Sequence, residues 1–156
     1  MRPNDVAFAI APGDGRPIEL GTFAMTEKAS AESTGGLVSV LEATEPAGFG
    51  PPMHIHHDAA EAFYVLEGEY MMFLGEREVV CPAGTFIFIP AGVPHGFRVG
   101  ATDSRKLNFF FPAAMTGYFD ELSAAVARGE ADESVLDAIA RAHNMEITGP
   151  VPETYL

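Results

Sequence analysis

Short apolar runs separated by glycine and proline dominate the chain from residue 37 to residue 112. Runs of strand length, rich in β-branched and aromatic residues, cover 37–45, 53–56, 62–67, 70–74, 78–81, 85–89, 96–99 and 106–111. Glycine or proline stands at nearly every junction, as in strands joined by tight turns. Strands at this even spacing cannot each bury a face alone, so we expect them to close into a β-barrel or a double-sheet jelly roll.

Residues 1–36 carry a weaker version of the same pattern. Short apolar pieces at 6–10 and 18–25 are separated by the turn sequence Pro-Gly-Asp-Gly at 12–15, and a polar run follows at 26–36. This arrangement predicts edge strands and a loop.

The period of the apolar residues changes after Met115. They recur there at helical spacing, and Gly129 stands where a helix would end. A second helix is expected next, with Asp132 or Ser134 as its N-cap and an apolar stripe that runs up to His143.

These patterns together predict one all-β domain over residues 1–156. Its parts are edge strands and a loop in 1–36, a barrel core in 37–112 and two C-terminal α-helices in 113–156. We expect the tail at 149–152 to be extended and to pack back on the barrel or on a partner.

Charge and cysteine content exclude several classes of function. The chain carries 9 Lys and Arg against 22 Asp and Glu, a formal net charge of −13 that repels nucleic-acid phosphates and anionic lipids. Its single cysteine, Cys81, excludes an internal disulfide and a cysteine-rich zinc site. No stretch approaches the ~20 apolar residues of a membrane span, and Asp5 interrupts the first apolar run. We therefore expect a cytoplasmic protein with neither nucleic-acid nor membrane partners.

The histidines provide the candidate chemistry. Side chains two residues apart on a strand share a face, so His54 and His56 are expected to point together into the barrel while His57 faces away. Glu61 begins the next strand, and His95 follows a turn rich in proline and glycine at the start of another.

Three imidazoles and one carboxylate in one cavity suit one divalent transition metal ion per chain, such as Fe, Ni, Co, Mn, Zn or Cu. An isolated histidine in a strand is usually a hydrogen-bonded packing or surface residue, and His57 and His143 are given that role.

The spacing of these residues resembles the signature of the cupin superfamily. The first motif reads Gly, five residues, His-x-His, three or four residues, Glu, six residues, Gly, and it is filled by Gly48, His54, His56, Glu61 and Gly68. The second reads Gly, five residues, Pro-x-Gly, two residues, His, three residues, Asn, and it is filled by Gly84, Pro90, Gly92 and His95, with Val99 in place of the asparagine. The resemblance covers about residues 37–112. It implies a cupin-type double-stranded β-barrel in which the metal ligands are His54, His56, Glu61 and His95.

A looser likeness extends over more of the chain. The strings HIHHDAAEAFYVLEGEYMMFLGE, GYFDELS and ARAHNMEITGP resemble small monocupins that are similar to quercetin 2,3-dioxygenase. This likeness implies an oxygenase reaction class, with Glu61 both binding the metal and taking the substrate proton as general base.

Phenylalanines supply a candidate substrate pocket. Most of them should be core residues, but Phe63, Phe97 and Phe109, with Val99 in the apolar wall, are predicted to line a cavity suited to a flat phenolic ligand. Only four cationic residues lie between Gly48 and Pro112, and none is expected to face the ligands: Arg77, Arg98, Arg105 and Lys106.

Three functions fit these observations. The leading one is a metal-dependent dioxygenase acting on a small aromatic or enol-bearing molecule. The second is a cyclase, isomerase or lyase that uses the metal ion as a Lewis acid. The third is a non-catalytic barrel that binds a small molecule. We also expect a homodimer, because the edge strands of an open barrel need covering.

Overall fold

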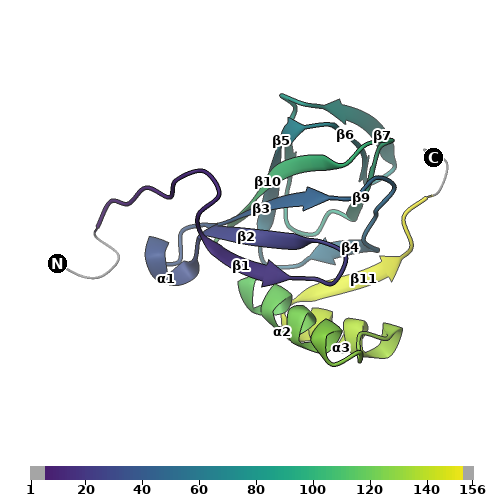
Figure 1. The fold of residues 1–156 in the computed structure, drawn as a ribbon. Coiled ribbons are helices and arrows are strands. Elements are labelled where there is room, and N and C mark those ends of the chain that lie inside the picture. The colour runs from purple at the N-terminus through teal and green to yellow at the C-terminus, as the bar shows by residue number, and fades with distance from the viewer. Residues whose placement is uncertain (1–5, 153–156) are drawn as a thin grey trace.

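The strands of the chain pair into two antiparallel sheets. The computed structural model describes residues 6–152, and Figure 1 shows its elements. The first sheet has the order β1-β2-β3-β10-β5-β8. Its strands are β1 (Arg16–Glu19), β2 (Ala24–Ala29), β3 (Ser39–Glu45), β10 (Ser104–Phe111), β5 (Ala60–Glu67) and β8 (Phe86–Ile89). The second sheet has the order β11-β4-β9-β6-β7. Its strands are β11 (Met145–Gly149), β4 (Met53–His56), β9 (His95–Val99), β6 (Glu69–Leu74) and β7 (Arg77–Pro82).

The main core lies between the two sheets. Phe63 and Ile87 come from the first sheet and pack with Tyr70, Met72 and Phe97 of the second. The mostly β fold and the eight strand-length runs between residues 37 and 112 are confirmed, because a strand lies in each of them. Among the described residues the pairing gives two open sheets, not one closed ring of strands.

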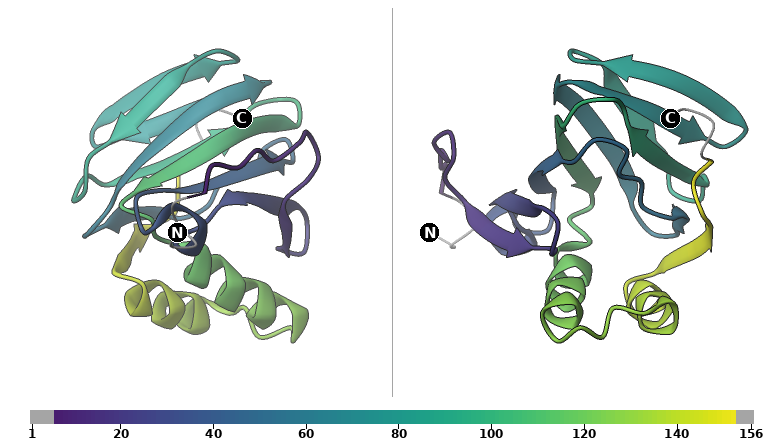
Figure 2. Two further views of the ribbon diagram at one scale, coloured as in Figure 1. Left: turned by 90° about the vertical axis from the view of Figure 1, so that its left-hand side faces the viewer. Right: turned by 45° about the vertical axis from the view of Figure 1, so that its right-hand side comes forward.

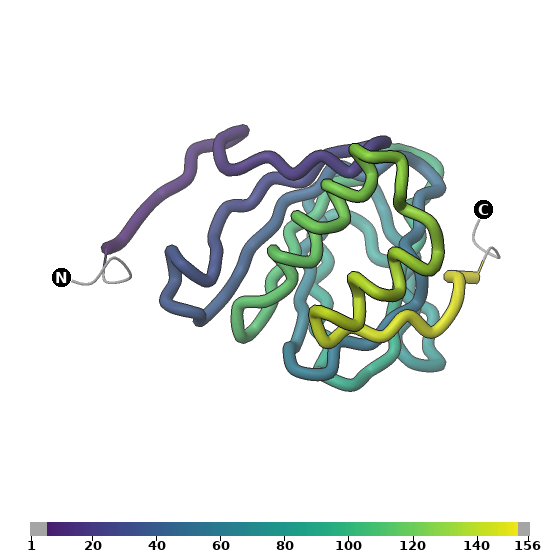
Figure 3. Tube along the Cα trace, turned by 90° about the horizontal axis from the view of Figure 1, so that it is seen from below, coloured from purple at the N-terminus to yellow at the C-terminus, as the bar shows by residue number. Residues whose placement is uncertain are grey.

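Two helices lie across one end of the sheets, as predicted. They are α2 (Thr116–Ala127) and α3 (Glu133–Ala142). Figure 2 shows both lying below the strands, and in Figure 3, which is seen from below, they lie in front of the strands. The Asp132 side chain caps α3 by accepting a hydrogen bond from the Val135 N–H at 3.0 Å. A second core cluster joins the helices to the strands and includes Leu41, Phe110 and Tyr118.

The N-terminal region differs from its prediction. Residues 6–10 form no strand, and Val6, Phe8 and Ile10 are exposed. The polar run at 26–36 contains most of β2 and a short helix, α1 (Ala31–Thr34). An apolar run without a partner strand leaves its backbone unpaired, whereas β2 gains a ladder with β3 despite its polar sequence.

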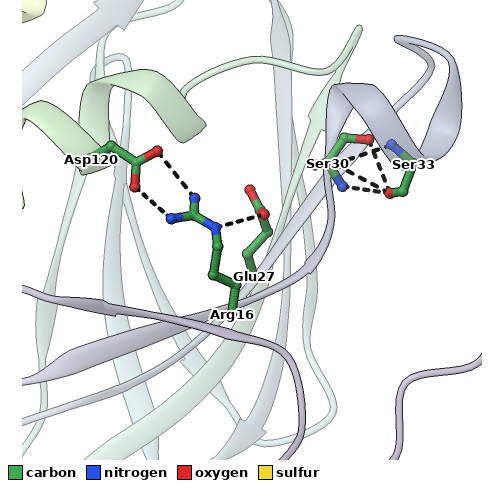
Figure 4. Close-up of polar contacts among 5 residues, drawn as sticks. All are labelled: Arg16, Glu27, Ser30, Ser33 and Asp120. Atoms are coloured by element: carbon green, nitrogen blue, oxygen red, sulfur yellow. Dashed lines mark hydrogen bonds and ion pairs between the residues drawn. The ribbon is translucent and has the colours of Figure 1, made fainter.

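Charged and hydroxyl side chains fix these N-terminal elements. Arg16 on β1 donates to both carboxylate oxygens of Asp120 on α2, at 2.9 and 3.1 Å, and to Glu27 on β2 at 3.2 Å (Figure 4). Ser30 and Ser33 form a capping box at the start of α1. The Arg16 contacts therefore join the β1–β2 hairpin to α2.

The C-terminal tail packs on the sheets, as expected, and adds a strand that the sequence did not predict. Strand β11 pairs with β4, with Met145 opposite His56. Val151 beyond it is buried, and the Arg98 guanidinium donates to the Val151 and Pro152 carbonyls at 3.2 and 3.0 Å. No helix among residues 6–152 is long and apolar enough to cross a membrane.

Candidate metal centre

Three strands, β4 and β9 of the second sheet and β5 of the first, bring the four predicted ligands together. His54 and His56 lie on β4, His95 lies opposite His54 at the start of β9, and Glu61 faces them from β5. One donor atom from each of the four side chains can be chosen so that all four atoms lie within 4.8 Å of one another. The alternation of a β-strand explains why His54 and His56 converge.

Glu61 contacts two of the three histidines of this group. Its Oε2 atom lies 3.0 Å from His56 Nε2 and 2.9 Å from His95 Nε2. Burial opposes the ionisation of Glu61, but the hydrogen bonds from His56 and His95 outweigh it and hold the pKa of the Glu61 carboxyl well below its usual range. Glu61 is therefore a carboxylate, the form that binds cations.

Backbone carbonyls orient two of the imidazoles. His54 Nδ1 lies 2.8 Å from the Pro52 oxygen, and His95 Nδ1 lies 2.9 Å from the Val93 oxygen. A carbonyl only accepts hydrogen bonds, so both Nδ1 atoms carry a proton and donate it outward, and both Nε2 atoms face the centre. This outer contact is the usual one for a histidine that binds a metal ion.

The pKa values of His54 and His95 are shifted in opposite directions. Burial, with help from the nearby His95, lowers the pKa of His54 to about 4, so His54 is neutral at pH 7. Burial also disfavours a charge on His95, but its hydrogen bond to Glu61 outweighs burial and raises the pKa of His95 above its ordinary value. A neutral imidazole with a free Nε2, beside a carboxylate, fits the donor set of a divalent transition metal. The four residues can therefore hold such an ion.

His57 lies outside this group. It is exposed, and its Nε2 lies 2.9 Å from Glu146 Oε2 on β11. The alternation of β4 thus separates it from His54 and His56, as the sequence predicts.

A cavity of about 310 Å³ adjoins the centre, and His54, His56 and Glu61 form part of its wall. Most of the remaining wall is apolar, and α2 and α3 cover one side of it through residues such as Tyr118 and Leu136. A metal ion bound here would therefore lie next to a partly enclosed apolar space.

The predicted pocket residues divide into two groups. Phe63 and Phe97 line the cavity. Val99 is fully buried in the core between the sheets, and Phe109 stacks on Phe111 on the other face of β10; neither is among the lining residues. Phe110 lines the cavity instead, with its ring 5.4 Å from that of His56.

The same strand corrects a second expectation. Lys106 was expected to face away from the centre, but it is buried and lines the cavity together with Asn108. On β10 the inward residues are the even-numbered ones, Lys106, Asn108 and Phe110. A prediction that places Phe109 on the inward face necessarily places Lys106 on the outward face, because the two residues lie on opposite faces of the strand. Assigning the two faces of β10 the wrong way round therefore explains both wrong predictions.

Comparison with known proteins agrees with this picture. Residues 40–110 match the family model of the cupin domain. Over 102 residues, 65% of this chain, the sequence is 28% identical to quercetin 2,3-dioxygenase of Bacillus subtilis (strain 168). The match covers 30% of that enzyme, so the matched part of this chain spans less than a third of the enzyme's length.

Solved structures show the same fold. A predicted oxalate decarboxylase from Thermotoga maritima superposes with a TM-score of 0.62 at 20% identity, over 67% of this chain and 99% of that one. The Streptomyces nucleoside dehydratase Pac13 superposes with a TM-score of 0.60 at 10% identity, over 96% of this chain and 97% of that one. The segment that matches the cupin domain includes all four clustered donors, and the chain resembles small, quercetinase-like cupins.

Proposed function

We propose that the chain is a metal-dependent dioxygenase that acts on a small aromatic or enol-bearing molecule. The observation that carries this proposal is the cluster of four donors beside a cavity lined by aromatic rings, with His54, His56 and Glu61 in the cavity wall. The sequence similarity to quercetin 2,3-dioxygenase supports the same reaction class.

We assign the metal ligands to His54, His56, Glu61 and His95. When bound, a divalent transition metal ion would supply a Lewis-acidic centre that can also take part in oxidation chemistry. The buried hydrogen bonds of His54 and His95 to backbone carbonyls hold these imidazoles in one orientation before the ion arrives.

The protein's own groups then bind and prepare the substrate. Phe63 and Phe97 offer ring faces and edges to a flat molecule, and Phe110 keeps the apolar wall continuous up to His56. Glu61 lies in the cavity wall, and we assign to its carboxylate the role of general base that takes the proton of a substrate hydroxyl group. The apolar wall excludes water around that proton transfer.

Oxygen uptake tests the reaction class. With quercetin, smaller phenols and enolisable diketones as probes, we expect substrate loss to consume dioxygen in an equimolar amount and to stop under anaerobic conditions. An oxygen electrode combined with chromatography of the substrate measures both quantities. Substrate loss that continues without dioxygen would instead assign the centre to a cyclase, isomerase or lyase. Tight binding without turnover would leave a small-molecule-binding cupin.

We also propose that the chain forms a homodimer. Phe86 and Phe88 on the edge strand β8 are 62% and 55% exposed, with Tyr64 beside them on β5, and Phe8 and Ile10 are exposed near the N-terminus. Exposed apolar residues on an unpaired edge favour association with a second copy. We expect the wild-type chain to sediment as a dimer and a variant with Phe86→Ser and Phe88→Ser as a monomer. Analytical ultracentrifugation measures this, and a monomeric wild-type chain at micromolar concentration would contradict it.

A further inference from the structure

A buried polar cluster occupies the cavity beyond the metal centre. Lys106 on β10 is 1% exposed, and its Nζ lies 2.9 Å from Glu45 Oε1 and 2.9 Å from Asn108 Oδ1. The Tyr70 hydroxyl also donates to Glu45 Oε1, at 2.9 Å. Glu45, Lys106 and Asn108 line the same cavity as His54, His56 and Glu61. The cavity therefore has a second polar region besides the metal centre.

The orientation of the Asn108 amide follows from this contact. A lysine ammonium only donates hydrogen bonds, so the Asn108 oxygen must face Lys106 and the amide nitrogen must point elsewhere. Asn108 is 4% exposed, and its NH₂ group has no acceptor among residues 6–152. Asn108 lines the cavity, so its NH₂ group is open there to an acceptor atom of a ligand or of water.

The register of β10 and β5 places this donor relative to the centre. Phe110 pairs with Glu61, Asn108 pairs with Phe63, and Lys106 pairs with Val65. Two residues along a strand advance by about 7 Å. The backbone of Asn108 therefore lies about 7 Å along the strand from the Phe110–Glu61 pair, and the backbone of Lys106 lies about 7 Å farther. The Phe63 ring lies in the row of Asn108, beyond the metal centre.

The charges of the cluster indicate which chemical group it receives. Glu45 and Lys106 offset each other, and the Lys106 ammonium also lies 4.5 Å from the centroid of the Phe97 ring. Burial and the adjacent Glu45 raise the pKa of Tyr70, so its hydroxyl keeps its proton and donates. The group offered to the cavity is thus the neutral Asn108 NH₂, which suits an uncharged acceptor such as a carbonyl or ether oxygen.

We infer that Asn108, held by Lys106, forms a recognition site for a second oxygen of the substrate. This inference rests on the proposed function. It defines the substrate class as flat molecules with two oxygens: one that reaches the metal centre and an uncharged acceptor at the opposite end. Asn108 touches the substrate, whereas Lys106 and Glu45 are positioning residues.

Two phenols of similar size test this site without turnover. 4-Hydroxyacetophenone has a carbonyl opposite its hydroxyl group, and 4-ethylphenol lacks the carbonyl. Protein loaded with Co²⁺ is titrated anaerobically with each phenol by isothermal titration calorimetry. The ratio of the two dissociation constants is then compared between wild-type protein and Asn108→Leu. We expect the preference for the carbonyl compound to fall roughly five- to tenfold in Asn108→Leu, with the affinity for 4-ethylphenol nearly unchanged.

Two further variants guard against an indirect effect. Asn108→Asp keeps an oxygen for Lys106 and the shape of the side chain, and at pH 8 it has no N–H donor, so it should lose the preference as well. Phe109→Leu changes the opposite face of the same strand and should keep the preference.

The outcomes separate the two levels of the proposal. A wild-type chain that binds no Co²⁺ refutes the proposed function, and the recognition site with it. A chain that binds Co²⁺ but neither phenol refutes the recognition site. The recognition site is also refuted if the ratio of the two dissociation constants in Asn108→Leu and Asn108→Asp stays within about twofold of the wild-type ratio. Neither of these two results contradicts the metal centre.

Discussion

Replacing His54 and His56 together by alanine is expected to reduce the bound metal from about one ion per chain to less than about a tenth, and to abolish turnover. Both side chains converge on Glu61 and His95, so the double variant removes two of the four donors. Changing a group that merely orients a ligand lowers metal affinity by about 10- to 100-fold, and losing two ligands should cost more. Elemental analysis after reconstitution and gel filtration measures the metal content.

His57→Ala is the matched control for this variant. His57 neighbours His56 in sequence but is exposed and contacts Glu146, so its loss should leave the metal content at the wild-type value. The assignment of the ligands is wrong if the double variant stays fully loaded, or if His57→Ala loses the ion to the same extent.

Replacing Lys106 by methionine is expected to destabilise the protein by about 3–5 kcal/mol. The substitution keeps the side chain's length but removes the ammonium, which leaves the 3%-exposed Glu45 carboxylate without its cationic partner. Urea denaturation followed by circular dichroism measures the free energy of unfolding.

A compensating change tests the cause of this loss. Adding Glu45→Gln to Lys106→Met removes the uncompensated charge and keeps an acceptor for the Tyr70 hydroxyl, so the double variant should recover at least about half of the lost free energy. Arg105→Ala breaks solvent-accessible ion pairs with Glu42 and Glu67 on the other face of β10, and it should leave the denaturation midpoint nearly unchanged. A Lys106→Met protein within about 1 kcal/mol of wild type would show that the buried pair contributes little.

The metal centre could be predicted from sequence because the spacing of residues within single strands and turns is enough to locate its ligands. His54 and His56 need only the alternation of one short strand to share a face, and the turn before His95 marks where the next donor begins. The His-x-His spacing also separates His57 from its neighbours without knowledge of the rest of the fold. The structure brings together the four donors that the motif predicts.

The inner wall of β10 could not be predicted in the same way. Phe109, Phe110 and Phe111 are consecutive, so hydrophobicity does not reveal which of them faces inward. The polar residues on that strand mislead as well, because Lys106 and Asn108 are buried against each other and Glu45. Partners on β3 and β6 decide the parity, and those partners become known only when the sheets are assembled.

The ends of the chain show a similar limit. The apolar residues at 6–10 have no neighbour to pair with among the described residues, whereas the short alternation Met-Glu-Ile-Thr at 145–148 pairs with β4. Whether such a segment becomes a strand depends on an open sheet edge nearby, which is a property of the tertiary structure.

The pairing of β11 with β4 also has a consequence for protein synthesis. Strand β4, which carries His54 and His56, has β9 on one side and β11 on the other, and β11 ends at Gly149. A ribosome adds residues in order, so the cupin-matching segment at 40–110 emerges well before β4 can obtain its second neighbour. The histidines of β4 therefore gain their second neighbouring strand only after β11 has been made, and a nascent chain that stops before Met145 presents them on an unpaired sheet edge.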